Sequence, residues 1–219
     1  MFWGYKHDGI YQTVEEIPTK LYDSGVRPGD IRFVDKDNNG IIDTEDKMII
    51  GSPYPDVYGG FTNNFQYKNF DLSVLFTFSL GNDIASAWRA GLDHLGGRDY
   101  NNLYDSYKNR WTGENTSDWT PRATKSGWNL KNSSYFIEDG SYLRLKNITM
   151  GYNLPKSVLE RSGIDNVRFY ASVSNLFTLT SYSGYDPEAA SGTDAKTFGI
   201  DNLVTPQPRS VLFGFNLQF

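Results

Sequence analysis

The chain of 219 residues contains no cysteine and only two histidines, His7 and His94. The missing thiols exclude a disulfide framework, a cysteine nucleophile and a thiolate metal site. Two histidines are too few for a three-histidine zinc site. Positive charge is also scarce, because 21 Lys and Arg face 26 Asp and Glu, giving a net charge of −5. Nucleic-acid-binding proteins usually carry a basic face, so no nucleic-acid partner is expected.

Long apolar runs are missing as well, since no stretch approaches the roughly 18 apolar residues that a membrane-spanning helix requires. The spacings of a nucleophile elbow, a P-loop and a dinucleotide-binding loop are absent too, so the sequence predicts no enzyme. Aromatic residues are abundant, at 16% of the chain, and glycine occurs 21 times. This composition favours strands and turns over helices.

Alternation of apolar and polar residues begins at Val57 and indicates strands with one apolar face. A two-residue turn at Lys68 and Asn69 would fold the first two strands into a hairpin. Opposite residues share a face in such a hairpin. The apolar face would carry Tyr67/Phe70, Phe65/Leu72, Asn63/Val74, Phe61/Phe76 and Gly59/Phe78. The polar face would carry Gln66/Asp71, Asn64/Ser73, Thr62/Leu75, Gly60/Thr77 and Tyr58/Ser79.

Three further strands follow the hairpin. The first spans about residues 142–154, and its apolar phase slips near Lys146-Asn147, which predicts a β-bulge. The others are centred on 167–173 and 211–219, with a short turn and helix at 155–165 between the first two. Two long connections, 81–141 and 178–207, are polar and irregular, and a short helix is expected near 101–112.

Short and long connections alternate along these strands, as they do in outer-membrane barrels with short periplasmic turns and long outer loops. The pattern predicts an all-β fold, made of antiparallel strands of a transmembrane β-barrel with long extracellular loops. Residues 1–56 would be an extracellular loop region, and residues 57–219 would supply the barrel strands. Five strands cannot close a wide barrel, and open edges are unstable in lipid, so a C-terminal part of a larger barrel is expected.

Several stretches resemble the C-terminal region of SusC/RagA-type TonB-linked outer-membrane transporters. They include GDIRFVDKDNNGIIDTEDKMIIG from residue 29, SSYFIEDGSYLRLKNITMGYNLP from residue 133 and PRSVLFGFNLQF at residues 208–219. The resemblance implies a bacterial outer-membrane protein that imports oligosaccharides or peptides. It also implies a SusD-like surface lipoprotein as partner, energy supplied through the TonB complex and contact with outer-membrane lipid. No plug domain or TonB box occurs in this sequence.

An acidic loop at residues 35–46 matches the twelve-position EF-hand-like calcium pattern. Oxygen ligands are expected at positions 1, 3, 5, 7, 9 and 12, with Gly40 at the turn. The predicted metal ligands are Asp35, Asp37, Asn39, Ile41 through its carbonyl, Asp43 and Asp46. Position 12 is Asp rather than Glu, and the alternative is a turn held by its own side chains. A soluble calcium-containing β-sandwich binding module is the other fold that fits this motif and the alternation.

Other candidate residues lie in the long connection. Four tryptophans there could stack on sugar rings, although packing within the loop or contact with the lipoprotein is the favoured interpretation: Trp88, Trp111, Trp119 and Trp128. Asp93 beside His94, and Glu138 beside Asp139, could suggest acid–base chemistry. We expect these side chains to be solvated instead, because polar loops and turns usually carry such residues.

Overall fold

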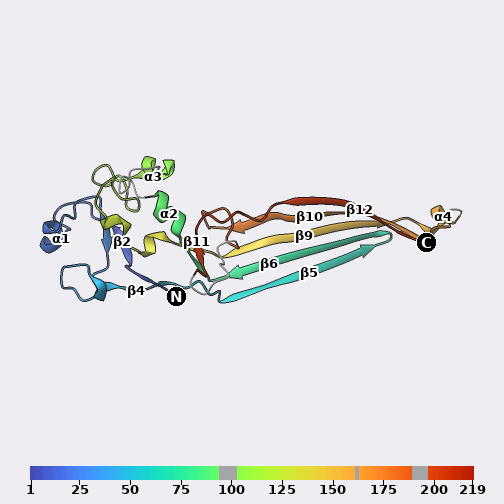
Figure 1. Cartoon of the computed structure of the whole chain (residues 1–219), viewed down its shortest axis with the longest axis horizontal. Helices are drawn as coiled ribbons and strands as arrows, with labels where there is room; N and C mark the ends of the chain where they lie inside the picture. The colour runs from blue at the N-terminus through green and yellow to red at the C-terminus, as the bar shows by residue number, and fades with distance from the viewer. Residues whose placement is uncertain (94–102, 161–162, 189–196) are drawn as a thin grey trace. The chain divides into compact units, whose positions relative to one another are not determined.

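The computed structural model describes residues 1–93, 103–160, 163–188 and 197–219 (Figure 1). The chain forms two compact units that interleave along the sequence. The core unit comprises Met1–Tyr54, Asp83–Glu138 and Ala190–Val204, and the sheet unit comprises Pro55–Asn82, Asp139–Ala189 and Thr205–Phe219. The sequence suggests one boundary between residues 56 and 57, whereas the chain leaves the sheet unit and returns to it more than once.

The sheet unit contains five long antiparallel strands in the order β12-β10-β9-β6-β5. These are β5 (Val57–Tyr67), β6 (Phe70–Leu80), β9 (Tyr142–Asn153), β10 (Asn166–Thr180) and β12 (Ser210–Gln218). Figure 1 shows them side by side. A tilted membrane-spanning strand needs about 9–11 residues, and every one of the five reaches that length. The short helix α4 (Lys156–Leu159) lies in the turn between β9 and β10.

The predicted hairpin is confirmed in full, because every pair from Gly59/Phe78 to Tyr67/Phe70 is observed. Lys68 adopts a left-handed conformation with φ of 53°, which a two-residue hairpin turn requires. The predicted bulge on β9 is also confirmed. Asn147 pairs with Leu75 and Leu145 with Phe76, which leaves Lys146 as the extra residue on β9.

The bulge keeps each face of the sheet uniform. In a regular strand, Leu145 and Ile148 would point to opposite sides, because they are three positions apart. The bulge places them opposite Phe76 and Val74, both on the apolar face. Large side chains on that face are open to the surroundings, with Phe65 60% and Phe213 79% exposed. An apolar surface of this extent has to be covered by another apolar phase.

The core unit is built from short elements. They are β1 (Phe2–Gly4), β2 (His7–Ile10), α1 (Thr19–Asp23), β3 (Ile31–Phe33), η1 (Thr44–Asp46), β4 (Met48–Gly51), β7 (Asp83–Ser86), α2 (Ala87–Leu92), α3 (Tyr104–Asn109), η2 (Trp128–Leu130), η3 (Ser134–Phe136), β8 (Ile137–Asp139, whose last residue falls in the sheet unit) and β11 (Ile200–Asp201). The helix expected near residues 101–112 corresponds to α3, and residues 101 and 102 lie outside the described part of the chain. The rest of the connection 81–141 is less irregular than the sequence suggests.

Residues 1–54 and part of the long connection together form a buried core that the polar composition of residues 1–54 hides. Ile31 is fully buried, and Val26, Ile10 and Tyr135 lie in the same cluster. The strand pairs β1–β4 and β2–β3 frame this cluster. None of the helices in the described part of the chain has the length and apolar character needed to cross a bilayer.

Candidate functional site

The acidic loop connects β3 to β4 and closes with the single turn η1. Its sharp bend depends on two left-handed residues, Asn38 with φ of 58° and Gly40 with φ of 77°. Glycine adopts this conformation without steric cost, which explains its place at position 6 of the loop.

Three of the six predicted ligands converge. Asp35, Asp37 and Asp46 each offer a carboxylate oxygen, and these oxygens all lie within 4.8 Å of one another. Asp46 is fully buried and accepts hydrogen bonds from Lys36 N at 2.7 Å and Asp43 N at 2.8 Å. Backbone N–H groups therefore hold the carboxylates in place, while each oxygen keeps a lone pair for another partner.

The other three predicted ligands shape the loop in this structure. The Asp43 side chain accepts from Glu45 N at 2.9 Å and forms a capping box with Asp46 at the start of η1. Asn39 Oδ1 accepts from Ile41 N at 2.8 Å, and the carbonyl of Asn39 accepts from Lys20 Nζ at 2.7 Å.

The negative charge of the loop extends to its neighbour Tyr5. Burial, together with the charges of Asp46 and Asp43, raises the pKa of the Tyr5 hydroxyl. The donor set is composed of oxygen atoms, which suits a hard cation such as calcium.

Two of the four tryptophans bond the long connection to residues 1–54. Trp111 Nε1 donates to Gln12 Oε1 at 3.0 Å, and Trp128 Nε1 donates to the carbonyl of Ile31 at 2.8 Å. Trp119 packs edge-on against His7 with ring centroids 4.5 Å apart. These contacts pack the three tryptophans against residues 1–54, which lie outside the long connection. Trp88 lies in α2.

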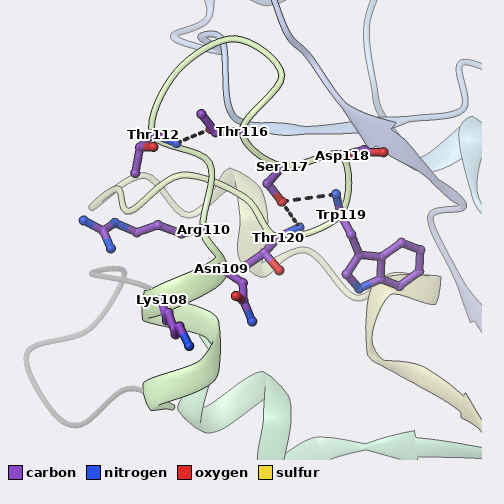
Figure 2. A pocket seen from close by; sticks show the side chains of 9 residues that line it. All are labelled: Lys108, Asn109, Arg110, Thr112, Thr116, Ser117, Asp118, Trp119 and Thr120. Carbon is purple, nitrogen blue, oxygen red and sulfur yellow. Dashed lines mark hydrogen bonds between the residues drawn. The ribbon is translucent and has the colours of Figure 1, made fainter.

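A hollow of about 570 Å³ lies between α3 and the loop that follows it (Figure 2). Its hydroxyl groups already serve the loop, since Ser117 Oγ accepts from Thr120 N at 2.9 Å and Thr116 Oγ1 accepts from Thr112 N at 2.9 Å. In Figure 2, the side chains of Lys108, Arg110 and Trp119 point away from one another. This hollow therefore lacks converging groups that could bind a ligand.

The carboxylates beside His94 and Asp139 differ from the expectation of solvated residues. Asp93 is buried and accepts from Tyr135 Oη at 3.0 Å and from Arg89 Nη2 at 3.1 Å. Glu138 accepts from Ser86 Oγ at 2.7 Å, so it is not solvated either. The prediction was wrong for both residues. Arg89 lies only four residues before Asp93, but Tyr135, which bonds Asp93, and Ser86 and Arg89, which bond Glu138, come from distant positions. Burial, followed by the charge of Asp93, raises the pKa of Tyr135.

Asp139 is exposed as expected, although it is the last residue of β8, and its side chain accepts from Ser141 N at 2.9 Å. His94 lies outside the residues that the structure describes.

The polar face of the sheet carries an ion pair that the sequence does not reveal. Arg168 on β10 binds Asp71 on β6 through two hydrogen bonds, from Nε at 3.1 Å and from Nη2 at 2.6 Å. Strand β9 runs between these two strands, and Gly151 stands where the pair crosses it. A side chain at Gly151 would collide with both partners, so glycine permits the crossing.

A patch of small polar side chains occupies the middle of the same face. Asn147 Nδ2 donates to Ser172 Oγ at 3.0 Å and to Ser174 Oγ at 3.1 Å, while Thr149 Oγ1 donates to Asn147 Oδ1 at 2.9 Å. These bonds link β9 to β10 and confirm that the face is polar.

Comparison with known proteins gives consistent results. TonB-dependent receptor P3 of Formosa agariphila is 39% identical over 226 residues, covering 100% of this chain and 22% of that receptor. TonB-dependent receptor SusC of Bacteroides thetaiotaomicron is 35% identical over 221 residues, covering 99% of this chain and 20% of SusC. The solved RagAB peptide transporter aligns with a TM-score of 0.76 at 24% identity, over 100% of this chain and 23% of that chain. No protein-family profile matches the chain.

Sequence and fold together define the class as outer-membrane β-barrel proteins, which confirms the predicted fold class and location. The chain belongs to the SusC/RagA-type TonB-dependent receptors, as its resemblance suggested. It spans about a fifth of the length of the curated relatives that it matches. The soluble β-sandwich is set aside, because the five long strands form one sheet with an uncovered apolar face.

Proposed function

We propose that the chain supplies wall strands and outer-loop structure to a TonB-dependent importer of large nutrients in the bacterial outer membrane. The observation that carries this proposal is the two-faced sheet of the sheet unit. Its apolar face, which includes Phe65 and Phe213, suits contact with outer-membrane lipid. Its polar face, with Asp71, Arg168 and Asn147, suits a water-filled lumen.

The partners follow from the relatives. The receptor would work with a SusD-like surface lipoprotein, draw energy from the TonB complex and take up an oligosaccharide or a peptide. SusC and the RagAB peptide transporter support this set of partners by similarity. Residues 1–56, with the acidic loop, would lie on the outer surface of the cell. Among the residues that the structure describes, no nucleophile or acid–base arrangement favours an enzyme.

Deletion and fractionation test the importer. Deleting the complete gene should abolish uptake of the nutrient that induces it, and the restored gene should return uptake. The complete product should fractionate with the outer membrane. Recovery in the cytosol, or unchanged uptake on every large nutrient tested, would contradict the proposal.

We further propose that the acidic loop binds one structural calcium ion through Asp35, Asp37, Asn39, Asp43, Asp46 and the carbonyl of Ile41. The convergence of three carboxylates supports it, and their mutual repulsion would be relieved by a divalent cation. Asp43 and Asn39 would have to turn from their present hydrogen bonds toward the ion. Ligand distances of roughly 2.3–2.6 Å are expected for calcium, and magnesium should compete poorly.

Calorimetric titration with calcium tests this site. Asp35→Ala together with Asp37→Ala should abolish calcium binding, because both substitutions remove converging carboxylates. Asp23→Ala is the matched control, since this exposed acid lies on α1 outside the loop. Unchanged calcium uptake in the double variant would show that the loop is only a turn.

A further inference from the structure

A pair of cations on β9 binds a carboxylate from the chain itself. Arg144 Nη1 donates to Glu188 Oε2 at 2.6 Å, and Lys146 Nζ donates to the same oxygen at 3.0 Å. Lys146 also reaches Glu188 Oε1 at 3.2 Å. Arg144, Lys146 and Glu188 form what we call the carboxylate cradle, which lies within the sheet unit.

Arg144 is held in place without Glu188. Its Nε donates to Thr178 Oγ1 at 2.9 Å, and its Nη2 donates to Asp186. Asp186 in turn accepts from Glu188 N at 2.9 Å and from Gln207 N at 3.1 Å. Arg144 and Asp186 are both buried. If the Glu188 side chain moved away, Arg144 Nη1 would still point to the position that the Glu188 carboxylate now occupies.

The charge balance shows what the cradle would then bind. Arg144 and Lys146 carry two positive charges, while Asp186 and Glu188 carry two negative charges. Withdrawal of the Glu188 carboxylate leaves one net positive charge beside a buried guanidinium. A partly buried cation without its partner is unfavourable, so an incoming anion would be attracted.

The cradle is also accessible. The Lys146 side chain is 32% exposed and the Glu188 side chain 33% exposed, in contrast to Arg144 and Asp186 beneath them. The Lys146–Glu188 pair is partly open to solvent, and ion pairs in contact with solvent contribute little to stability. The outer half of the network can thus open while the inner half stays formed.

We propose that Glu188 holds the place of a substrate carboxylate, and that the cradle selects acidic peptides during import. This inference rests on the proposed import function. A peptide is favoured because the present occupant is itself a glutamate, whose main-chain N–H is bonded at the same site by Asp186. A substrate carboxylate would displace the Glu188 side chain and accept from both Arg144 and Lys146.

Binding to the complete receptor in detergent tests the proposal. The probes are Gly-Glu-Gly and Gly-Gln-Gly, both blocked at their ends so that only the side chain differs in charge. Glu188→Gln should raise the affinity for Gly-Glu-Gly by about tenfold, since it removes the competing carboxylate from charge-assisted bonds. The affinity for Gly-Gln-Gly should stay unchanged. Adding Lys146→Gln should reverse the gain.

Lys156→Gln and Glu160→Gln are the matched controls, because these exposed residues lie at the other end of β9 and make the same charge changes. Neither should alter the affinity for either peptide. Equal binding of the two peptides to Glu188→Gln would overturn the proposal, as would tighter binding of glucuronate than of Gly-Glu-Gly. If Glu188→Gln fails to fold, Lys146→Gln alone should still weaken binding of Gly-Glu-Gly to the receptor.

These readouts are independent of transport. A receptor that binds the acidic peptide but imports no nutrient would contradict the proposed function and leave the cradle intact. A receptor that imports its nutrient and binds both peptides equally would contradict only the cradle.

Discussion

The core unit and the sheet unit solve the burial of apolar residues in opposite ways. The core unit packs Ile31, Val26 and Tyr135 against each other and leaves few of its strand residues uncovered. The sheet unit turns large side chains such as Phe65 and Phe213 outward. Water drives the first arrangement, whereas the second requires that another apolar phase cover the exposed side chains. Large apolar residues are therefore buried inside the core unit but exposed on one face of the sheet unit.

A substitution that creates a cavity in the core unit should cause the largest loss of stability. Ile31→Ala should lower the free energy of unfolding by about 2–5 kcal/mol, because it removes fully buried methyl groups. Ile49→Ala is the control on β4, where the side chain is 58% exposed, and should change it by less than about 0.5 kcal/mol. Urea unfolding followed by tryptophan fluorescence measures both. Equal effects would mean that the core unit has no well-packed core around Ile31.

A charged side chain on the apolar face of the sheet should cause a slightly smaller loss of stability than the cavity. Val74→Arg in the complete receptor, refolded into lipid vesicles, should lower the free energy of unfolding by about 2–4 kcal/mol near the midplane. Ser73→Arg, one residue earlier and on the polar face, should change it little. If both variants were tolerated equally, the two faces would not differ in their surroundings.

The glycine beneath the ion pair offers a finer test. Gly151→Ala should lower the stability by about 1–3 kcal/mol, because the new methyl group would separate Arg168 from Asp71. Gly113→Ala is the control, since no atom lies within 4 Å of the added group there. In an Arg168→Gln background, Gly151→Ala should have a much smaller effect. An undiminished effect would show that the strand, and not the ion pair, requires glycine.

The partly buried imidazole of His7 should make the stability of the core unit depend on pH. Burial is the largest cause that lowers the pKa of His7 to about 4, from an unfolded value of 6.5. The unfolded chain therefore binds more protons between these values, and stability should fall as the pH drops from about 6.5 to about 4. His7→Phe should flatten this slope while keeping the ring contacts with Trp119 and Tyr135. A slope that remained would have to come from carboxylates.

The strands of the sheet unit were predictable because every strand repeats one simple rule. A residue on a strand faces the side opposite to its neighbour, so Phe61, Phe65 and their partners identify the apolar face directly. The slip of phase on β9 even located the bulge at Lys146. The acidic loop was predictable for a similar reason, because its spacing and Gly40 are local features.

The core unit was hidden because its contacts join distant parts of the sequence. Trp128 bonds to Ile31, and Arg122 Nε donates to Asp30 Oδ1 at 2.9 Å across 92 residues. No periodicity connects such positions, so the sequence showed only polar, turn-rich segments. For the same reason it described Asp93 and Glu138 as solvated. The structure instead bonds the buried Asp93 to Tyr135 and the partly buried Glu138 to Arg89.

Local pattern was sufficient for the sorting of the two sheet faces, the hairpin register and the position of the acidic loop. Tertiary structure alone brought Arg144 and Lys146 to Glu188, and Arg168 to Asp71 across Gly151. The physical reason is that alternation states which side of a strand a residue faces, but not which charged group it meets there. That choice depends on which strands become neighbours and on where the chain returns to the sheet.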